Sequence, residues 1–447
     1  MDRYRDLFRS RTRSVEQTAR QFINGLFQAE RRNMQQMAEV VEGADQQTLQ
    51  YLLSDAKWDH RKVQRQVARD ANTHLGGHEE SCLIVDESGF GKKGRHSAGV
   101  ARQWNGRLGK IENSQVGVFA ALSYGTGVSI IGAQLYLPQE WTKSPRRCRA
   151  AGIPREARVF RRKSDIALDL INDAHAAGVV ANWHCFDAGY GKEPGFLRAV
   201  DDRSWRFMAD VHRDQRIYLE DPQPQPAAVQ RASSRRSLHL TTHATPITVE
   251  KWAANQAASA WQTLTLRPST VGPLQVQALS RRVWLWNREE AAARQWTVVV
   301  VREVDNPSEI HYALSNAPAD TPLLILAQIE RQRFWVEHAF GDAKSELGMA
   351  HYEVRTWVGW HRHMTLCMMA QLFALEERLR HAEDIPLLSP RDIRGILAQA
   401  LPRHQLKNGE IFAQIQARHK QRWDSTRSRY EKLGFTPEYR PVRKSTM

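Results

Sequence analysis

Two short apolar segments, each followed by an aspartate, constrain the fold of this chain more than any other feature. Residues 82–85 (CLIV) lead to Asp86, and residues 183–186 (WHCF) lead to Asp187. Short apolar runs that end at turn residues are typical of buried strands. We expect these two strands to lie side by side in a sheet, which would bring both carboxylates to one edge.

The segments around these strands indicate an α/β fold with a mixed sheet. A Gly-Thr-Gly turn joins two further strand-like runs and predicts an antiparallel hairpin. The order β-β-β-α-β-α-β follows from the strand 82–85, the hairpin 116–125 and 128–137, the helix 165–177, the strand 183–186, the helix 193–200 and the strand 205–211.

A third carboxylate lies on a long predicted helix, 321–349. Arg333, Glu337 and Lys344 follow one another at steps of four and seven residues, so the helical period places them on one side. We expect the opposite side to be buried against the sheet; it carries Leu324, Trp335 and Ala339, with Phe334 on its flank. A carboxylate between two cations on a buried helix suggests chemistry rather than stability alone.

Length, charge and cysteine usage narrow the class of protein. With 447 residues the chain should form several domains. Its 64 Lys and Arg residues against 49 Asp and Glu residues give a formal net charge of +15, which favours nucleic acid as the partner over a merely soluble surface. Four scattered cysteines without CxxC spacing predict neither a zinc site nor disulfides. No segment has the length of a membrane span or resembles a signal peptide, so we expect a cytoplasmic protein.

The remaining segments supply candidate DNA contacts. Residues 91–115, expected to be a glycine-rich loop, carry Lys92, Lys93 and Arg95, and such interspersed cations suit phosphate contacts. The N-terminal region reads as helical, either a DNA-binding domain or a capping bundle. Residues 212–320 read as a β-rich insertion with strands at 242–252, 281–287, 295–304 and 310–316.

Together, Asp86, Asp187 and Glu337 suggest a magnesium-dependent reaction on a phosphodiester. Three carboxylates at one point repel one another unless cations bind, and Mg²⁺ takes carboxylate, water and phosphate oxygens. Two such ions about 3.5–4 Å apart activate a water or a 3′-hydroxyl and stabilise the leaving oxygen. Arg333 and Lys344 would then contact the DNA backbone.

These motifs resemble a known family. Arg333, Glu337 and Lys344 are similar to the Y-x2-R-x3-E-x6-K signature of bacterial insertion-sequence DDE transposases, and Asp86 and Asp187 match its two aspartates. Where the signature has tyrosine, this chain has Glu330, which we expect on the face of Glu337. The resemblance covers roughly residues 31–380, and further segments match the insertion-sequence-701 group: HSAGVARQW, IENSQVGVF, LYLPQEW and RCRAAGIP.

The resemblance implies a ribonuclease-H-like core interrupted by the β-rich insertion. The implied domains are a helical DNA-binding domain (1–78), the first part of the core (79–211), the insertion (212–320), the second part of the core (321–385) and a helical basic C-terminal region (386–447). Asp86, Asp187 and Glu337 would be the catalytic metal ligands for two Mg²⁺ ions per site, with Mn²⁺ as a substitute. Relatives with this insertion stack a flipped base on one of its tryptophans, here Trp284 or Trp286.

The resemblance also implies an activity and partners. A homodimer in a synaptic complex would cut double-stranded DNA at terminal inverted repeats and join the freed 3′-hydroxyls to target DNA, in the cytoplasm and at the nucleoid when DNA-bound. Two alternatives stay open. One is a catalytically silent domesticated transposase acting as a DNA-binding regulator, and the other is a nuclease without strand transfer.

Overall fold

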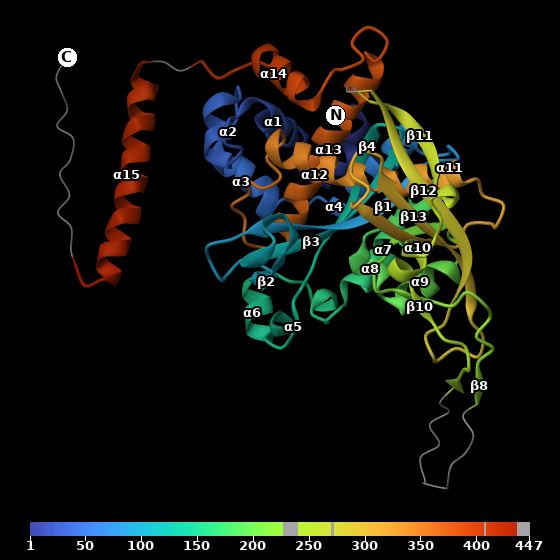
Figure 1. Cartoon of the computed structure of the whole chain (residues 1–447). Coiled ribbons are helices and arrows are strands. Elements are labelled where there is room, and N and C mark those ends of the chain that lie inside the picture. Colours follow the sequence, from blue (N-terminus) through green and yellow to red (C-terminus); the bar gives the residue numbers. More distant parts are fainter. Residues whose placement is uncertain (227–239, 270–271, 406–407, 436–447) are drawn as a thin grey trace.

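The structure, a computed structural model, describes residues 1–226, 240–269, 272–405 and 408–435, and its centre is one large mixed sheet (Figure 1). Ten strands lie in the order β11-β12-β13-β14-β6-β5-β1-β3-β2, with β4 paired to β3. The predicted α/β class with a mixed sheet is confirmed. The strands of its N-terminal part are β1 (Cys82–Gly91), β2 (Ala101–Asn105), β3 (Lys110–Tyr124), β4 (Gly127–Leu135), β5 (Trp183–Phe186) and β6 (Phe207–Asp210).

The middle of the sheet is parallel, and its register aligns the residues that precede Asp86, Asp187 and Asp210. Asp86 does not end its strand as we expected, because β1 continues to Gly91 alongside β3. β5 pairs with β1 on one side and with β6 on the other, both in parallel. Val85 lies opposite Phe186, and Phe186 lies opposite Ala209. These strands are buried on both faces, as expected for parallel strands covered by helices. The prediction that the strands before Asp86 and Asp187 are neighbours is therefore confirmed.

β3 and β4 form the predicted hairpin, while the stretch 91–115 differs from the loop that we expected. Tyr124 pairs with Gly127, and Gly125 takes the positive φ of 56° that the tight turn requires. Residues 91–115 contain β2 and the first part of β3, which pair with each other. Glycine-rich composition suggested a loop, but alternate side chains of β2 are buried and hold it as a strand.

Two side chains of α13 (Trp357–Arg380) cap the free edge of β4. Gln371 accepts a hydrogen bond from the Ile130 N–H at 3.0 Å, and His361 Nε2 accepts one from the Leu135 N–H at 3.3 Å. Such acceptors satisfy edge donors that would otherwise pair with another chain. Gln371 also donates to the Ala339 carbonyl at 2.9 Å, which ties α13 to α12 (Phe334–Ser345).

The N-terminal helices share one core with α13. Arg362 is buried and donates to the carbonyls of Leu53, Ala56 and Trp58, so it ties α13 to the loop after α3. Residues 1–78 are thus helical, as predicted, and their helices pack onto the core. These elements are η1 (Asp2–Phe8), α1 (Glu16–Gln28), α2 (Met34–Val40), α3 (Gln46–Ser54) and α4 (His60–Leu75).

Helices connect β4 to β5 and β5 to β6 along the chain. α7 packs its apolar face on β3 and β4, where Leu170 lies close to Gly132. The connecting helices are α5 (Gln139–Thr142), α6 (Pro145–Ala150), η3 (Arg155–Ala157), α7 (Lys163–Ala176), α8 (Ala188–Gly191) and α9 (Pro194–Asp201). All four cysteines are buried free thiols.

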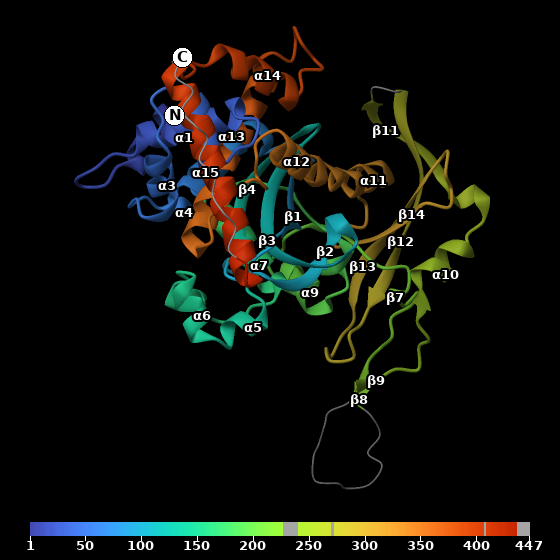
Figure 2. The same ribbon diagram turned by 90° about the vertical axis from the view of Figure 1, so that its left-hand side faces the viewer.

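The β-rich insertion extends the central sheet. β14 pairs antiparallel with β6, so the insertion continues the hydrogen bonding of the core. Figure 2 shows the insertion strands β12, β13 and β14 on one side of the core strands β1 and β3. The strand expected at 242–252 is wrong in part, because only Ile247–Thr248 is a strand and Thr248 then caps a helix. The insertion contains β7 (Arg216–Ile217), β8 (Gln225–Pro226), β9 (Leu240–Thr241), β10 (Ile247–Thr248), α10 (Val249–Ala254), η4 (Ala258–Ala260), β11 (Gln262–Ser269), β12 (Gly272–Leu285), β13 (Arg294–Glu303) and β14 (Ile310–Ser315).

The long helix expected at 321–349 is two helices that meet at Arg333. α11 (Leu323–Gln332) packs on β5, β6 and the insertion, whereas α12 packs on α13 and β4. Because each helix has its own partners, the predicted buried side is wrong for Leu324 and Phe334, which are exposed. The buried side chains are Leu326, Ala327, Ile329 and Glu330 in α11 and Val336, Ala339, Phe340 and Ala343 in α12.

Two further helices follow α13 at its C-terminal side. α14 (Pro390–Ala400) begins with a capping box between Ser389 and Asp392. α15 (Asn408–Lys432) stands beside the body in Figure 1, and Arg418 on it forms an ion pair with Glu39 of α2. Among the described residues, no helix is long and apolar enough to cross a membrane.

Candidate active site

Three aspartates form a row across the parallel strands β1, β5 and β6. The residues that follow the aligned positions Val85, Phe186 and Ala209 are Asp86, Asp187 and Asp210. Asp187 also caps α8, because its side chain accepts a hydrogen bond from the Tyr190 N–H at 3.1 Å. This cap ends β5 and fixes the place of the carboxylate at the strand end.

One cavity of about 1080 Å³ brings the predicted site residues together. Its lining includes all three predicted carboxylates and both predicted cations of the helix: Asp86, Asp187, Arg333, Glu337 and Lys344. Side chains that the sequence did not single out also line it, among them Glu87, Trp104 and Asp210.

Arg333 is the central cation of this cavity. Its Nε donates to Asp210 Oδ2 at 2.7 Å, and its Nη1 lies 3.3 Å from Glu337 Oε1. Burial opposes the charge of Arg333, but the carboxylates of Asp210, Asp86, Glu337 and Asp187 outweigh this and raise its pKa. Arg333 therefore remains charged at every pH at which the protein is folded.

The electrostatics of the row favour a cation. Burial, together with the charge of Asp187, raises the pKa of Asp86 to about 7. Burial likewise raises the pKa of Asp210 to about 6, although the neighbouring Arg333 opposes this. Carboxylates that are buried close together hold protons unless a cation compensates them, so the row is a place where a bound cation would gain free energy.

The carboxylates do not converge as a ready-made metal site. Within the described residues, no group of three or more His, Cys, Asp or Glu side chains is arranged to hold a metal ion. The Glu337 side chain is 57% exposed and turned to Arg333. The oxygen donors nevertheless have the chemistry that Mg²⁺ prefers, and Asp86 and Asp187 come from the adjacent strands β1 and β5 at aligned positions.

The predicted DNA-contacting cations have different surroundings. Lys344 lines the cavity, with its amino group 5.1 Å from the centre of the Phe90 ring. Lys92 is half-buried instead: its amino group lies 3.4 Å from the centre of the Tyr352 ring, and burial lowers its pKa to about 8. Lys93 and Arg95 are exposed outside the cavity lining. DNA contact by these side chains stays a prediction.

The two tryptophans expected to stack a base lie away from the carboxylates. Trp284 belongs to β12 and pairs through its backbone with Tyr218. Trp286 donates from its indole N–H to the Glu290 carbonyl at 2.8 Å. Both are half-buried, and neither lines the cavity. Base stacking by either residue therefore remains a prediction from the resemblance.

Asp210 is the site residue that sequence reasoning missed. A signal was present, because Asp210 directly follows the apolar residues Phe207–Ala209 of a predicted strand, just as Asp86 and Asp187 follow theirs. What the sequence lacked was the parallel pairing of β5 with β6, which places the third strand end in the same row.

Glu330 does not lie on the face of Glu337 that lines the cavity, contrary to expectation. Its side chain is only 4% exposed, and its carboxylate lies 3.3 Å from Arg331 Nε and 3.8 Å from His311 Nδ1. Glu330 belongs to α11, which packs on β5, β6 and the insertion, and it is absent from the cavity lining. Burial raises the pKa of Glu330 to about 7.

We expect the Glu330→Gln variant to be more stable than the wild type at high pH. The pKa of Glu330 is near 4.5 in the unfolded chain and about 7 in the folded chain. Below pH 4.5 the carboxyl is protonated in both states and costs the wild type nothing. Between pH 4.5 and 7 folding must bind a proton, so the wild type loses stability as the pH rises to about 7. The variant should therefore unfold like the wild type near pH 5 and gain on the order of 1–3 kcal/mol at pH 8. Urea unfolding at both pH values measures this, and an equal effect at both would contradict it.

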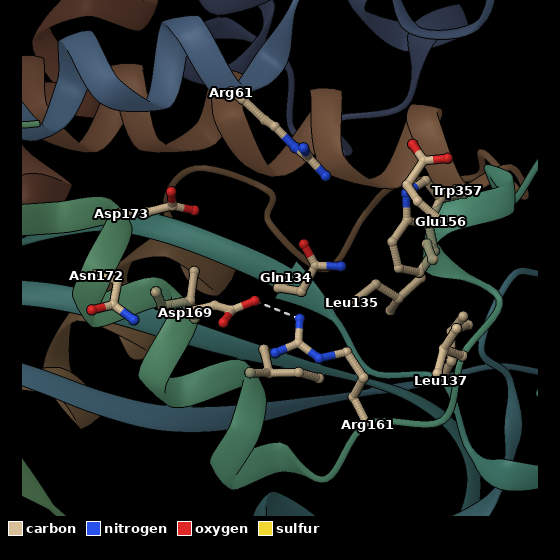
Figure 3. Close-up of a pocket in the computed structure, with 14 residues that line it drawn as sticks. Arg61, Gln134, Leu135, Leu137, Glu156, Arg161, Asp169, Asn172, Asp173 and Trp357 are labelled. Carbon is tan, nitrogen blue, oxygen red and sulfur yellow. Dashed lines mark hydrogen bonds and ion pairs between the residues drawn. The ribbon is translucent and has the colours of Figure 1, made fainter. Parts of the chain in front are cut away.

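A second cavity, of about 410 Å³, lies between α4, β4 and α7 and serves as a contrast (Figure 3). Its carboxylates Asp169, Asp173 and Glu156 come from the helices α7 and η3 rather than from the sheet. Arg161 binds Asp169 directly, as the dashed line in Figure 3 marks. Asp169 therefore offers a matched control for substitutions at the first cavity.

Comparison with known proteins gives two matches. A family model described as DDE superfamily endonuclease matches residues 4–273, an interval that includes Asp86 and Asp187 and ends before Glu337. A curated relative, "Probable transposase for insertion sequence element IS701" of Microchaete diplosiphon, is 26% identical over 217 residues, which are 48% of this chain and 53% of the relative. The chain thus spans about half the length of this relative. The family implies a ribonuclease-H-like core, in agreement with the predicted fold and resemblance.

Proposed function

Since this chain belongs to the DDE superfamily endonuclease family, we propose that it is a transposase that cuts the ends of a mobile DNA element and joins them to target DNA. One observation carries the proposal: Asp86, Asp187 and Glu337 line one cavity together with Arg333 and Lys344. Carboxylates and cations in one cavity suit a reaction at a phosphodiester, where metal ions and a negative backbone must be held together.

The donor set fits two divalent cations, Mg²⁺ or Mn²⁺. When bound, such ions activate the attacking water or 3′-hydroxyl and stabilise the leaving oxygen. Asp86 and Asp187 are the carboxylates that would hold them, and the raised pKa of Asp86, which burial and the charge of Asp187 cause, supports this role. Glu337 Oε1 is paired with the Arg333 guanidinium in this structure. Glu337 would become the third carboxylate ligand when this ion pair breaks.

Arg333 and Lys344 are proposed to hold the scissile phosphate and its neighbour. Arg333 presents a planar fork of donors that matches phosphate oxygens. Asp210 holds Arg333 at the wall of the cavity through a 2.7 Å hydrogen bond, so it positions the guanidinium without touching the substrate. Release of Glu337 by Arg333 would leave part of the guanidinium free for the phosphate.

The proposed partners are double-stranded DNA carrying terminal inverted repeats and a target duplex. The net charge of +15 supports a polyanion partner. Joining two ends at one target requires two active sites, so we propose a homodimer in the synaptic complex. The proposed location is the cytoplasm, at the nucleoid when bound to DNA.

Plasmid cleavage tests the proposed function. A supercoiled plasmid carrying the inverted repeats that flank the reading frame should be cut at the repeat ends in Mg²⁺ or Mn²⁺, and joined products should follow. EDTA should abolish both products. Cutting without joined products would support a nuclease that lacks strand transfer.

One observation favours a second candidate, a DNA-binding regulator without catalysis. Glu337 is bound to Arg333, and the described carboxylates are not gathered as a metal site. A regulator of this kind would bind the repeats specifically in a mobility-shift assay and leave the plasmid intact at every Mg²⁺ concentration. Metal-dependent cleavage would exclude it.

A further inference from the structure

Trp104 stands out among the tryptophans of this chain. It is 60% exposed, and it is the only tryptophan of the described residues that is exposed rather than buried or half-buried. It also lines the cavity that contains Asp86, Asp187 and Arg333. Among the described residues its indole ring has no hydrogen-bond, ring or cation partner. A large apolar ring held in water beside charged groups costs free energy unless something covers it in use.

The strand pair β2–β3 presents this ring in a fixed direction. Gln103, the preceding residue, donates to the Ser114 carbonyl at 2.8 Å, and Asn105, the following residue, is buried against Gly89 of β1. Because side chains alternate along a strand, these two inward anchors turn Trp104 outward. The backbone at Trp104 is thus held by inward contacts of its two neighbours, while its own side chain faces solvent.

The outward face of this strand pair is apolar and carries a cation. Ile111 lies directly opposite Trp104 and is 58% exposed, so the two form one apolar surface. Arg102, two residues before Trp104 on β2, is exposed and lies on the same face. An aromatic ring beside a cation is an arrangement that proteins use to stack a nucleobase while holding a phosphate.

We propose that Trp104 stacks on an unpaired nucleobase of the DNA end that is being processed. The proposal rests on the proposed function, since Arg333 and Lys344 are expected to hold phosphates in the same cavity. The base attached to such a phosphate lies within a few ångströms of it, and Trp104 supplies the flat apolar surface there. Trp284 and Trp286 lie outside this cavity and are not needed for the contact.

A fluorescent base tests the proposal without any cleavage. The probe is a short duplex with a single-stranded 3′ extension that carries 2-aminopurine at its first unpaired position, bound in EDTA to the Asp86→Asn variant of the full chain. Stacking on tryptophan should quench the probe. Adding Trp104→Ala should remove the quenching and weaken binding about tenfold. Trp104→Phe should retain part of both, because it keeps a π-face.

Trp284→Ala and Trp286→Ala serve as matched controls and should quench like the parent chain. Quenching that survives Trp104→Ala, or that is lost in either control instead, would overturn the proposal. Because Trp104 is exposed, its variants should melt at the parent temperature, and circular dichroism checks this. A parent chain that does not bind the probe at all would contradict the proposed function itself, whereas binding without Trp104-dependent quenching would contradict only the stacking.

Discussion

The Asp86→Asn, Asp187→Asn and Glu337→Gln variants are each expected to cut the repeat-bearing plasmid at less than about one hundredth of the wild-type rate. Loss of a residue that only supports a metal ligand typically costs 10–100-fold, and loss of a ligand should cost more. Amides keep the shape of these side chains but remove the charge that holds the cation. Initial rates of nicking in Mg²⁺ measure the effect.

The Asp169→Asn variant is the control for these three. Asp169 is also a carboxylate beside a cavity and is also bound by an arginine, but it lies with Arg161 in the second cavity. It should cut at the wild-type rate. If the three variants cut as well as Asp169→Asn does, the assignment of the site is wrong.

The Arg333→Met variant is expected to lose both stability and cleavage. Asp210 would be left as a largely buried carboxylate without its partner, since its side chain is only 16% exposed. Removing one member of such a pair costs about 3 kcal/mol. Urea unfolding should show a larger loss near pH 8 than near pH 5, because relieving the penalty by protonating Asp210 costs more free energy as the pH rises.

A double substitution separates the two effects. The Arg333→Met/Asp210→Asn chain should recover most of the stability, because no buried charge is left unpaired. It should not recover cleavage, because the phosphate would still lack its guanidinium. Recovery of cleavage together with stability would mean that Arg333 acts only through the fold. The Arg331→Met variant is a neighbouring control for cleavage alone, since Arg331 pairs with Glu303 and with the buried Glu330, both outside the cavity lining.

Much of the site could be predicted because its signals are local. Asp86 and Asp187 each follow a short apolar strand, and both strand assignments depend only on neighbouring residues. The spacing of Arg333, Glu337 and Lys344 is likewise local to one helical segment. All five residues line one cavity. Their catalytic and binding roles remain the proposal that the variants above test.

The parts that could not be predicted depend on contacts between distant segments. Lys92 resembled a loop cation, yet it packs on Tyr352, which lies far along the chain. The break at Arg333 has no proline or glycine to announce it and follows from the different partners of α11 and α12. The pairing of β14 with β6, which merges the insertion with the core, is also non-local.

Exchange of a carboxylate for a thiolate tests most directly whether Asp86, Asp187 and Glu337 hold the metal ions. Mg²⁺ is a hard cation that binds oxygen, whereas Mn²⁺ accepts sulfur more readily. Plasmid cleavage by Asp86→Cys, Asp187→Cys and Glu337→Cys should be absent in Mg²⁺ and partly restored in Mn²⁺, while Asp169→Cys should cut in both. Cleavage in Mg²⁺ at the wild-type rate by these three variants, or failure of Mn²⁺ to restore any of them, would contradict the account.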